Sequence, residues 1–258
     1  MDRPLERNSI SAICFDAVGT LIYPSPSAAE VYWRVGREFG SRLDLPTVKS
    51  RFSIAFRRIE SATEPGCGEA AAESQLITSE PLERQRWRQI VSETIPDLDD
   101  PQACFEALWN HFAQPQHWRL FDDVTPALER LLGLGLHLVM ASNFDGRLHP
   151  LCTAFPMLSK LSPRFVSSEL GHRKPSRQFY RQIASRLNLP PQSLLMVGDD
   201  PEFDFAAARR ADWQAILLDR DPRHRTEDSP SPAGQTSTIS TLMRLADLLE
   251  TDSSAKNC

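Results

Sequence analysis

The stretch "ICFDAVGTLIYP" (13–24) contains the first side chain that could do chemistry. Asp16 directly follows an apolar run and precedes a turn that contains Gly19. A carboxylate held at the end of a buried strand can attack an electrophilic centre and form a covalent intermediate. Val18, two residues after Asp16, has no exchangeable proton. The sequence therefore predicts a nucleophile without a proton donor in the same turn.

Further polar side chains occur at three later places, each next to the end of an apolar run: Ser142, Asn143, Lys174, Asp199, Asp200 and Asp204. Hydroxyl, amide and ammonium groups donate hydrogen bonds to the oxygens of an anion. Grouped carboxylates are the protein ligands that Mg²⁺ prefers. Each residue alone would be explained as a helix cap, a turn residue or a surface charge. Their order along the chain favours a single shared site.

The segments around these residues alternate between strand and helix patterns. Four apolar runs predict buried strands: "SAICFD", "LHLVMA" (136–141), "SLLMVG" and "QAILLD". The helical patterns between them are "TPALERLLGLG" with Thr125 as N-cap, "SRQFYRQIASRLNL" (176–189) with Ser176 as N-cap, and "PEFDFAAARRAD". Strands separated by such helices form parallel sheets with right-handed crossovers. Because ligands bind at the carboxyl ends of these strands, the polar residues are expected in one cleft.

Residues 24–117 show a different hydrophobic pattern, which predicts a helical insertion. Apolar residues recur at helical spacing in "SAAEVYWRVGREF", "TVKSRFSIAFRRI", "PLERQRWRQIVSETI" and "DPQACFEALWNHF". Such stripes are typical of a helical core. We therefore expect a core domain formed by residues 1–23 and 118–258, and a helical cap domain formed by residues 24–117. "SATEPGCGEAAAES" is expected to be a flexible connection, "EDSPSPAGQTST" a loop and "ISTLMRLADLLE" a closing helix.

The bulk properties exclude several classes of partner. A net charge of -5 and a pI near 5.7 do not favour binding to nucleic acid or to an anionic membrane surface. Five scattered cysteines without a C-x-x-C pair predict a reducing compartment rather than a disulfide framework. The charged N-terminus "MDRPLERNSI" lacks an apolar signal core. These features predict a cytoplasmic protein that binds neither nucleic acid nor membrane.

Taken together, the motifs "FDAVGTL", "MASN", "RKP" and "VGDDPEFD" resemble those of the haloacid dehalogenase superfamily of aspartate-nucleophile hydrolases. The segments "SNFDGRL", "KPSRQFY", "RWRQIV" and "GDDPEFDFAAARRADW" look like its rhythmically expressed gene 2-like group. The resemblance covers nearly the whole chain, because the helical insertion falls where subfamily I members carry their cap. It implies an α/β fold: a Rossmann-like parallel sheet core with an inserted α-helical cap domain.

The resemblance also implies a role for each motif. Asp16 would be the nucleophile, with Ser142 and Lys174 as the other catalytic residues. The groups expected to contact the substrate are Gly19, Thr20, Ser142, Asn143 and Lys174. A Mg²⁺ ion would be held by Asp16, the backbone carbonyl of Val18 and Asp199, with Asp204 either supporting these ligands without touching the ion or serving as an alternate ligand. The implied substrate is a phosphate ester.

The chain departs from this pattern at Val18. In the phosphatases of the superfamily, a carboxyl at that position protonates the leaving alkoxide and then activates the hydrolytic water. General acid–base assistance is typically worth ~10²–10⁴-fold in rate, so we expect weak activity or a specialised phosphate ester. Asp145 in "SNFDGR" and Asp200 are the candidate substitutes.

Two alternatives remain open at this point. A 2-haloacid dehalogenase needs no such acid, because halide leaves without a proton, and "DAVGT" resembles its first motif. Three carboxylates in "GDDPEFD" would repel an anionic haloacid, however, and Arg34, Arg37 and Arg42 of the insertion are more typical of a surface than of an anion site. The other alternative is a phosphate-binding regulatory protein with little catalysis.

Overall fold

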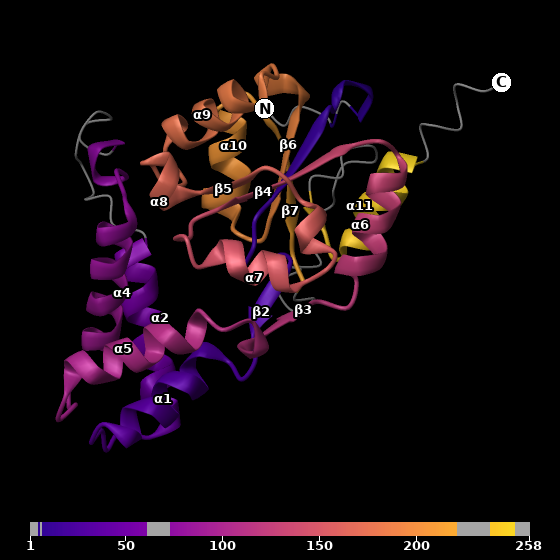
Figure 1. The fold of residues 1–258 in the computed structure, drawn as a ribbon. Helices are drawn as coiled ribbons and strands as arrows, with labels where there is room; N and C mark the ends of the chain where they lie inside the picture. The colour runs from indigo at the N-terminus through magenta and orange to yellow at the C-terminus, as the bar shows by residue number, and fades with distance from the viewer. Residues whose placement is uncertain (1–4, 6, 61–72, 221–237, 251–258) are drawn as a thin grey trace, which may run out of the picture.

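The computed structural model describes residue 5 and residues 7–60, 73–220 and 238–250. Most of the expected connection "SATEPGCGEAAAES" and nearly all of the expected loop "EDSPSPAGQTST" lie outside these residues. Figure 1 shows an open sheet with helices on both faces, and a separate group of helices beside it. Among the described residues, no helix is both long enough and apolar enough to cross a membrane.

The sheet contains six strands in the order β5-β4-β1-β6-β7-β8, and neighbouring strands run parallel. Their bounds are β1 Ala12–Phe15, β4 His137–Ser142, β5 Arg164–Val166, β6 Leu194–Gly198, β7 Gln214–Leu218 and β8 Thr238–Ile239. The chain proceeds outward from β1 through β4 to β5, and then outward on the other side from β6 to β8. The order of connections therefore reverses between β1 and β6, where open α/β sheets bind their ligands.

Strand β1 shows why this sequence forms the centre of the sheet. Its side chains alternate between the two faces, and all four are fully buried. Ile13 and Phe15 belong to one hydrophobic cluster, whereas Ala12 and Cys14 belong to the other. A strand buried on both faces needs apolar residues throughout, which "AICF" provides.

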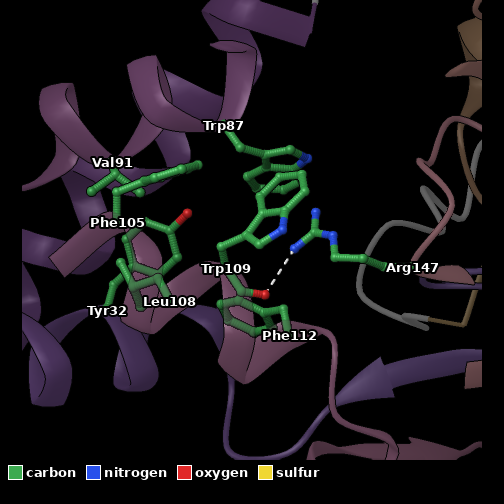
Figure 2. A pocket seen from close by; sticks show the side chains of 8 residues that line it. All are labelled: Tyr32, Trp87, Val91, Phe105, Leu108, Trp109, Phe112 and Arg147. Atoms are coloured by element: carbon green, nitrogen blue, oxygen red, sulfur yellow. Dashed lines mark hydrogen bonds between the residues drawn. The ribbon is translucent and has the colours of Figure 1, made fainter. Parts of the chain in front are cut away.

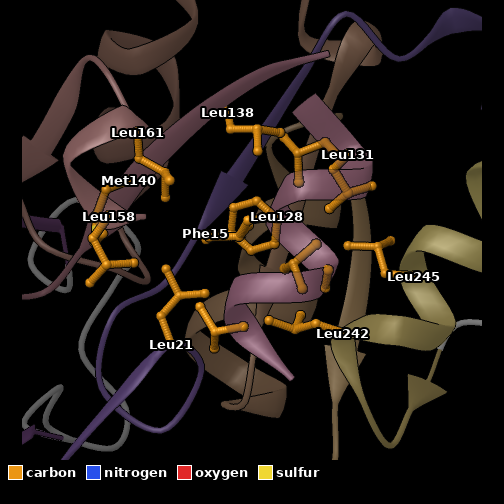
Figure 3. Packing of buried hydrophobic residues seen from close by; sticks show 14 of the residues in the cluster. Phe15, Leu21, Leu128, Leu131, Leu138, Met140, Leu158, Leu161, Leu242 and Leu245 are labelled. Atoms are coloured by element: carbon orange, nitrogen blue, oxygen red, sulfur yellow. The ribbon is translucent and has the colours of Figure 1, made fainter. Parts of the chain in front are cut away.

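Helices cover both faces of the sheet. On the Phe15 face pack α6 (Val124–Gly133), α7 (Leu148–Ala154) and α11 (Leu242–Glu250). Figure 3 shows Leu128 of α6 beside Phe15, and Leu242 and Leu245 of α11 on the other side of α6. The other face is covered by α9 (Arg177–Leu187) and α10 (Ala207–Arg210), with α8 (Ser167–Leu170) at its edge. Short 3₁₀ turns are η1 Arg7–Ser9, η2 Pro115–His117, η3 Leu158–Lys160 and η4 Pro191–Ser193.

The insertion forms helices α1 (Ala28–Glu38), α2 (Leu45–Glu60), α4 (Glu80–Thr94) and α5 (Pro101–Phe112). They share a hydrophobic cluster of their own, distinct from the two clusters of the sheet. An antiparallel pair, β2 (Ile22–Pro24) and β3 (Trp118–Leu120), connects this group to the core (Figure 1). The architecture is a Rossmann-like α/β core with an inserted helical cap, as predicted. The division into two domains at residues 24 and 117 stays a prediction.

Two local expectations require correction. Helix α6 begins at Val124 rather than after a Thr125 cap, because Pro126 fits within the first turn of a helix that starts earlier. The segment expected to begin an ordinary helix at Pro201 instead forms a π-helical turn, η5 (Pro201–Ala206), before α10. The N-cap Ser176 is as predicted, since its side chain accepts a hydrogen bond from Gln178 N, and Asp100 caps α5 in the same way by accepting from Ala103 N.

Candidate active site

Asp16 lies at the carboxyl end of β1, next to the point where the connections reverse. Its backbone N–H donates to the carbonyl of Val197 at 2.9 Å, which extends the pairing of β1 with β6 by one residue. The residue is only 7% exposed. A carboxylate so enclosed needs a compensating charge nearby, because burial of an unpaired charge is costly.

Lys174 supplies that charge. Its Nζ donates to Asp16 Oδ1 and to Asp204 Oδ1, each at 2.6 Å, and the residue is 2% exposed. Burial alone would lower the pKa of Lys174, but the charges of the two carboxylates and their hydrogen bonds outweigh it and raise the pKa. The ammonium group therefore remains protonated at neutral pH and acts as a donor only.

Asn143 fixes the backbone of Lys174. Its Oδ1 accepts from Lys174 N at 2.8 Å, and its Nδ2 donates to Lys174 O at 3.0 Å. Each end of the amide therefore makes one hydrogen bond to the lysine backbone, and the expected contact of Asn143 with substrate stays a prediction. Ser142 precedes Asn143 at the end of β4 and is buried.

Three carboxylates form a cluster that could hold a cation. One ligand atom from each of Asp16, Asp199 and Asp204 lies within 4.8 Å of the others. Burial raises the pKa of Asp204 to about 7, with Lys174 lowering it and Asp16 raising it further. The residue Asp199 as a whole is exposed, but its carboxyl group is largely shielded from water. This loss of solvation, together with the charge of Asp16, raises the pKa of Asp199 to about 6.

The turn after Asp16 shapes the site around Asp199. Gly19 adopts φ +87°, and a Cβ at this position would lie 2.3 Å from Asp199 Oδ2, so only glycine fits. Thr20 Oγ1 donates to Asp199 Oδ1 at 3.0 Å. The Gly19 N–H already donates to the Ile22 carbonyl at 2.9 Å. The expected use of this amide as a substrate donor therefore does not fit the structure. Val18 is 36% exposed in the same turn.

Asp200 and Gly198 position Asp204. Asp200 is the N-cap of η5, and its Oδ1 accepts from Glu202 N at 2.8 Å and from Phe203 N at 2.7 Å. Its own N–H donates to Asp204 Oδ2 at 3.1 Å. A Cβ at Gly198 would lie 2.1 Å from the same oxygen. Gly198 lies in the motif "VGDDPEFD", but its proximity to Asp204 can be recognised only from the folded structure.

Asp145 is held by an arginine of the same loop. Arg147 Nε and Nη2 donate to the two carboxylate oxygens at 2.7 Å each, and the Arg147 N–H donates to Oδ1 at 3.1 Å. Figure 2 shows the guanidinium reaching toward the cap, where it lies 3.4 Å from the ring centroid of Trp109 and donates to the Trp109 carbonyl at 3.2 Å. It helps to line a small cavity of about 10 Å³ among aromatic side chains.

This arrangement predicts the effect of a conservative change at Arg147. Arg147→Lys keeps the charge beside Asp145 but loses the bidentate geometry and the stacking on Trp109. We expect a loss of about 1.5–3 kcal/mol in the free energy of unfolding, the typical contribution of hydrogen bonds to charged groups. Urea unfolding measures it, with exposed Arg37→Lys as the control. A loss equal to that of the control would contradict the assigned role.

Three glutamates of the insertion contact the segments that carry the site, and sequence reasoning missed all of them. Glu60 pairs with Arg173, the residue before Lys174. Glu73 Oε1 accepts from Arg177 N at 3.0 Å, and Glu80 Oε1 accepts from Gly146 N at 2.8 Å. Long-range ion pairs and hydrogen bonds leave no periodic signal in a sequence. The arginines considered as anion ligands, Arg34, Arg37 and Arg42, are exposed instead.

Two known proteins are similar in sequence to this chain over most of its length. The haloacid dehalogenase-like hydrolase domain-containing protein 3 of Danio rerio is 27% identical over 219 residues, 83% of this chain and 87% of its own. The rhythmically expressed gene 2 protein of Drosophila melanogaster is 23% identical over 220 residues, covering 80% of this chain and 82% of its own.

Solved structures share the fold at low identity. The crystal structure of a dehalogenase matches with a TM-score of 0.66 at 17% identity, covering 93% of this chain and 97% of the other. The crystal structure of a phosphatase from Thermococcus onnurineus matches with a TM-score of 0.62 at 19% identity, covering 93% and 98%. Residues 10–212 match the family model described as haloacid dehalogenase-like hydrolase. Because that match spans most of the chain, the protein belongs to the haloacid dehalogenase-like hydrolases.

Proposed function

We propose that this protein is a Mg²⁺-dependent hydrolase in which Asp16 attacks phosphate esters, and that it hydrolyses ordinary alkyl esters slowly. The observation that carries the proposal is the cluster of Asp16, Asp199 and Asp204 around the single ammonium of Lys174. Three carboxylates facing one ammonium leave a net of two negative charges when all are ionised. That charge matches one divalent cation and makes the cluster a poor place for an anion alone.

The residues present fit Mg²⁺. Oxygen ligands suit this ion, and it commonly takes only one or two carboxylates and keeps several waters. Asp16, Asp199 and the Val18 carbonyl would hold it. Both oxygens of Asp204 are already engaged, one by Lys174 and one by the Asp200 N–H, which favours the role of a supporting rather than a direct ligand. The ion would screen the nucleophile and the phosphoryl group from each other.

The chain itself would orient the nucleophile and bind the phosphoryl oxygens. The ammonium of Lys174 holds the Asp16 carboxylate through Oδ1 and is close enough to that carboxylate to neutralise charge on an attached phosphoryl group. Ser142, at the end of the neighbouring strand, is the hydroxyl donor in this proposal. Thr20 fixes Asp199 and Asn143 fixes Lys174, so both act on the substrate through their partners.

Val18 limits what such a site can do. An alkoxide leaving group needs a proton, and Val18 has none to give. Neither substitute that the sequence offered is suited to the task, because Asp145 is bound by Arg147 and Asp200 caps η5. The proposed enzyme therefore attacks readily but lacks assistance for a basic leaving group.

Dehalogenation of 2-haloacids is the second candidate, favoured by the same valine because halide leaves without a proton. The carboxylate cluster argues against it, since a haloacid is itself an anion. A screen of phosphate esters and 2-haloacids, with Mg²⁺ and with chelator, separates the candidates. Mg²⁺-dependent release of phosphate that Asp16→Asn abolishes supports the proposal. Turnover of haloacids in chelator would contradict it, and binding of phosphate without turnover would favour a regulatory protein.

Mg²⁺ binding is predicted to stabilise the folded protein more strongly as pH rises. The pKa values of Asp199 (about 6) and Asp204 (about 7) lie above the ordinary value of an aspartate, so the folded apo-protein retains protons that the ion must displace. Deprotonation removes this competition. We expect millimolar Mg²⁺ to raise the melting temperature more at about pH 8 than at about pH 5.5, by mass action on the native state.

Asp199→Asn tests the same site directly. It should abolish the Mg²⁺-dependent shift, because it replaces a charged ligand, whereas Glu202→Gln should leave the shift unchanged. Glu202 is the matched control, since it is a nearby acid that pairs with Arg210 on the surface. A wild-type protein whose melting temperature is indifferent to Mg²⁺ at both pH values would remove the metal from the proposal.

A further inference from the structure

Hydrolysis through a covalent intermediate needs help twice. In the first step, the leaving oxygen departs from phosphorus and takes a proton if it is basic. In the second step, water attacks the phosphoryl-aspartate and must lose a proton as its oxygen bonds to phosphorus. The same kind of group serves both steps, first as an acid and then as a base. A site that lacks this group is therefore impaired in both steps.

Among the described residues, the groups around Asp16 do not offer such a base. Val18 carries no titratable atom, and the ammonium of Lys174 is protonated and donates to two carboxylates. The hydroxyl of Thr20 donates to Asp199. Asp204 accepts through both of its oxygens, from Lys174 and from the Asp200 N–H. Each of these polar groups is thus committed to another partner, and Asp199, which accepts from Thr20 through Oδ1, would be a ligand of the Mg²⁺ ion in the proposed function.

Asp145 and Asp200, the two acids considered as substitutes for the missing carboxyl, are also engaged. Asp145 receives three hydrogen bonds from Arg147. Asp200 receives two from the backbone of η5.

We infer that Asp16 accepts a phosphoryl group and retains it, and that the donors are phosphates whose leaving group departs as a stable anion, namely acyl and aryl phosphates. This inference rests on the proposed function. It adds a donor class and an outcome: the protein is a phosphoryl acceptor that turns over slowly. Lys174 favours the retained state, because its ammonium lies 2.6 Å from Asp16 Oδ1 and neutralises part of the phosphoryl charge.

The transfer step balances without a proton donor. An oxygen of the Asp16 carboxylate forms a bond to phosphorus, the bond from phosphorus to the leaving oxygen breaks, and the electron pair departs with a carboxylate or a phenolate. Hydrolysis of the phosphoryl-aspartate ends the retained state. In that step water forms a bond to phosphorus, the bond from phosphorus to the Asp16 oxygen breaks, and the water loses a proton. Because Val18 supplies no base to take that proton and the polar groups around Asp16 are engaged with other partners, we expect this step to be slowed by ~10²–10⁴-fold.

Intact-mass spectrometry of the full chain tests the inference. The protein is incubated with Mg²⁺ and either acetyl phosphate or p-nitrophenyl phosphate, desalted rapidly, and quenched in acid at increasing times. We expect a mass increase of one phosphoryl group that outlasts removal of the donor and is removed by hydroxylamine, as an acyl phosphate requires. The aryl donor should give a burst of nitrophenolate near one equivalent. Asp16→Asn should show neither adduct nor burst, and in Val18→Asp the adduct should decay ~10²–10⁴-fold faster.

The outcomes separate this inference from the function on which it rests. Steady release of nitrophenolate by the wild type at the rate of Val18→Asp, without an adduct, would overturn retention while leaving the hydrolase proposal intact. Absence of both adduct and nitrophenolate in the wild type and in Val18→Asp would overturn the proposed function, and retention with it.

Discussion

Val18→Asp is expected to raise kcat/KM for alkyl phosphates by up to ~10²–10⁴-fold, equivalent to about 3–5.5 kcal/mol of barrier. The new carboxyl would stand two residues after Asp16, the proposed nucleophile, in a turn whose path is fixed by Gly19 at φ +87°. Val18 is 36% exposed, so an aspartate there keeps contact with solvent and is not forced into an apolar core. The gain reaches its upper end only if the carboxyl is oriented toward the leaving oxygen.

Two controls make this result interpretable. Val18→Asn has the shape of aspartate without its acidity, so it should leave the rate near that of the wild type. Asp16→Asn should remove activity from the wild type and from Val18→Asp alike, because it removes the proposed nucleophile. Equal gains from Val18→Asp and Val18→Asn would mean that space or polarity, rather than proton transfer, limits the wild type.

Lys174→Met is expected to lower the free energy of unfolding by about 3–5 kcal/mol, the range for removing one partner of a buried ion pair. The substitution leaves Asp16 and Asp204 buried beside each other without a cation. In the wild type, the pKa of Lys174 is raised, so its stabilising contribution is fully present at neutral pH and is lost only at strongly alkaline pH.

The variant should also depend more steeply on pH than the wild type. Lys174 lowers the pKa of Asp204, so without it the native state would hold a proton on Asp204 that the unfolded state releases, and stability should fall more as pH rises from about 5 to about 8. Urea unfolding at both pH values measures this, and exposed Lys160→Met is the matched control. If Lys174→Met lowered the free energy of unfolding no more than Lys160→Met does, the role of Lys174 in compensating the buried carboxylates would be contradicted.

The parallel sheet, and the location of the site at the carboxyl ends of its strands, could be predicted from the sequence. Four apolar runs identified β1, β4, β6 and β7, and a parallel sheet must bring their ends to one edge. Asp16 and Lys174 are 158 positions apart, yet their contact follows from this topology. The short strands β5 and β8 were missed, since two or three residues are too few to show a period.

The partners of individual side chains were harder to predict. Asn143 suggested a substrate contact, but the fold places the Lys174 backbone against both ends of its amide. Asp145 and Asp200 looked like spare acids, and their hydrogen bonds to Arg147 and to the start of η5 became evident only in three dimensions. Residue type limits what a side chain can do, whereas its neighbours decide which of those roles it takes.

The dependence of rate on leaving-group basicity tests the central claim most directly. The measurement is kcat/KM, which reports the transfer of the phosphoryl group to Asp16, for a series of phosphate monoesters from nitrophenyl through phenyl to alkyl, with Mg²⁺ present. The account predicts a steep fall with rising leaving-group pKa in the wild type and a much shallower one in Val18→Asp, because only the variant can protonate the leaving oxygen. Equally shallow dependence in both proteins, with ordinary rates on alkyl esters, would contradict it and would show that another group carries the proton.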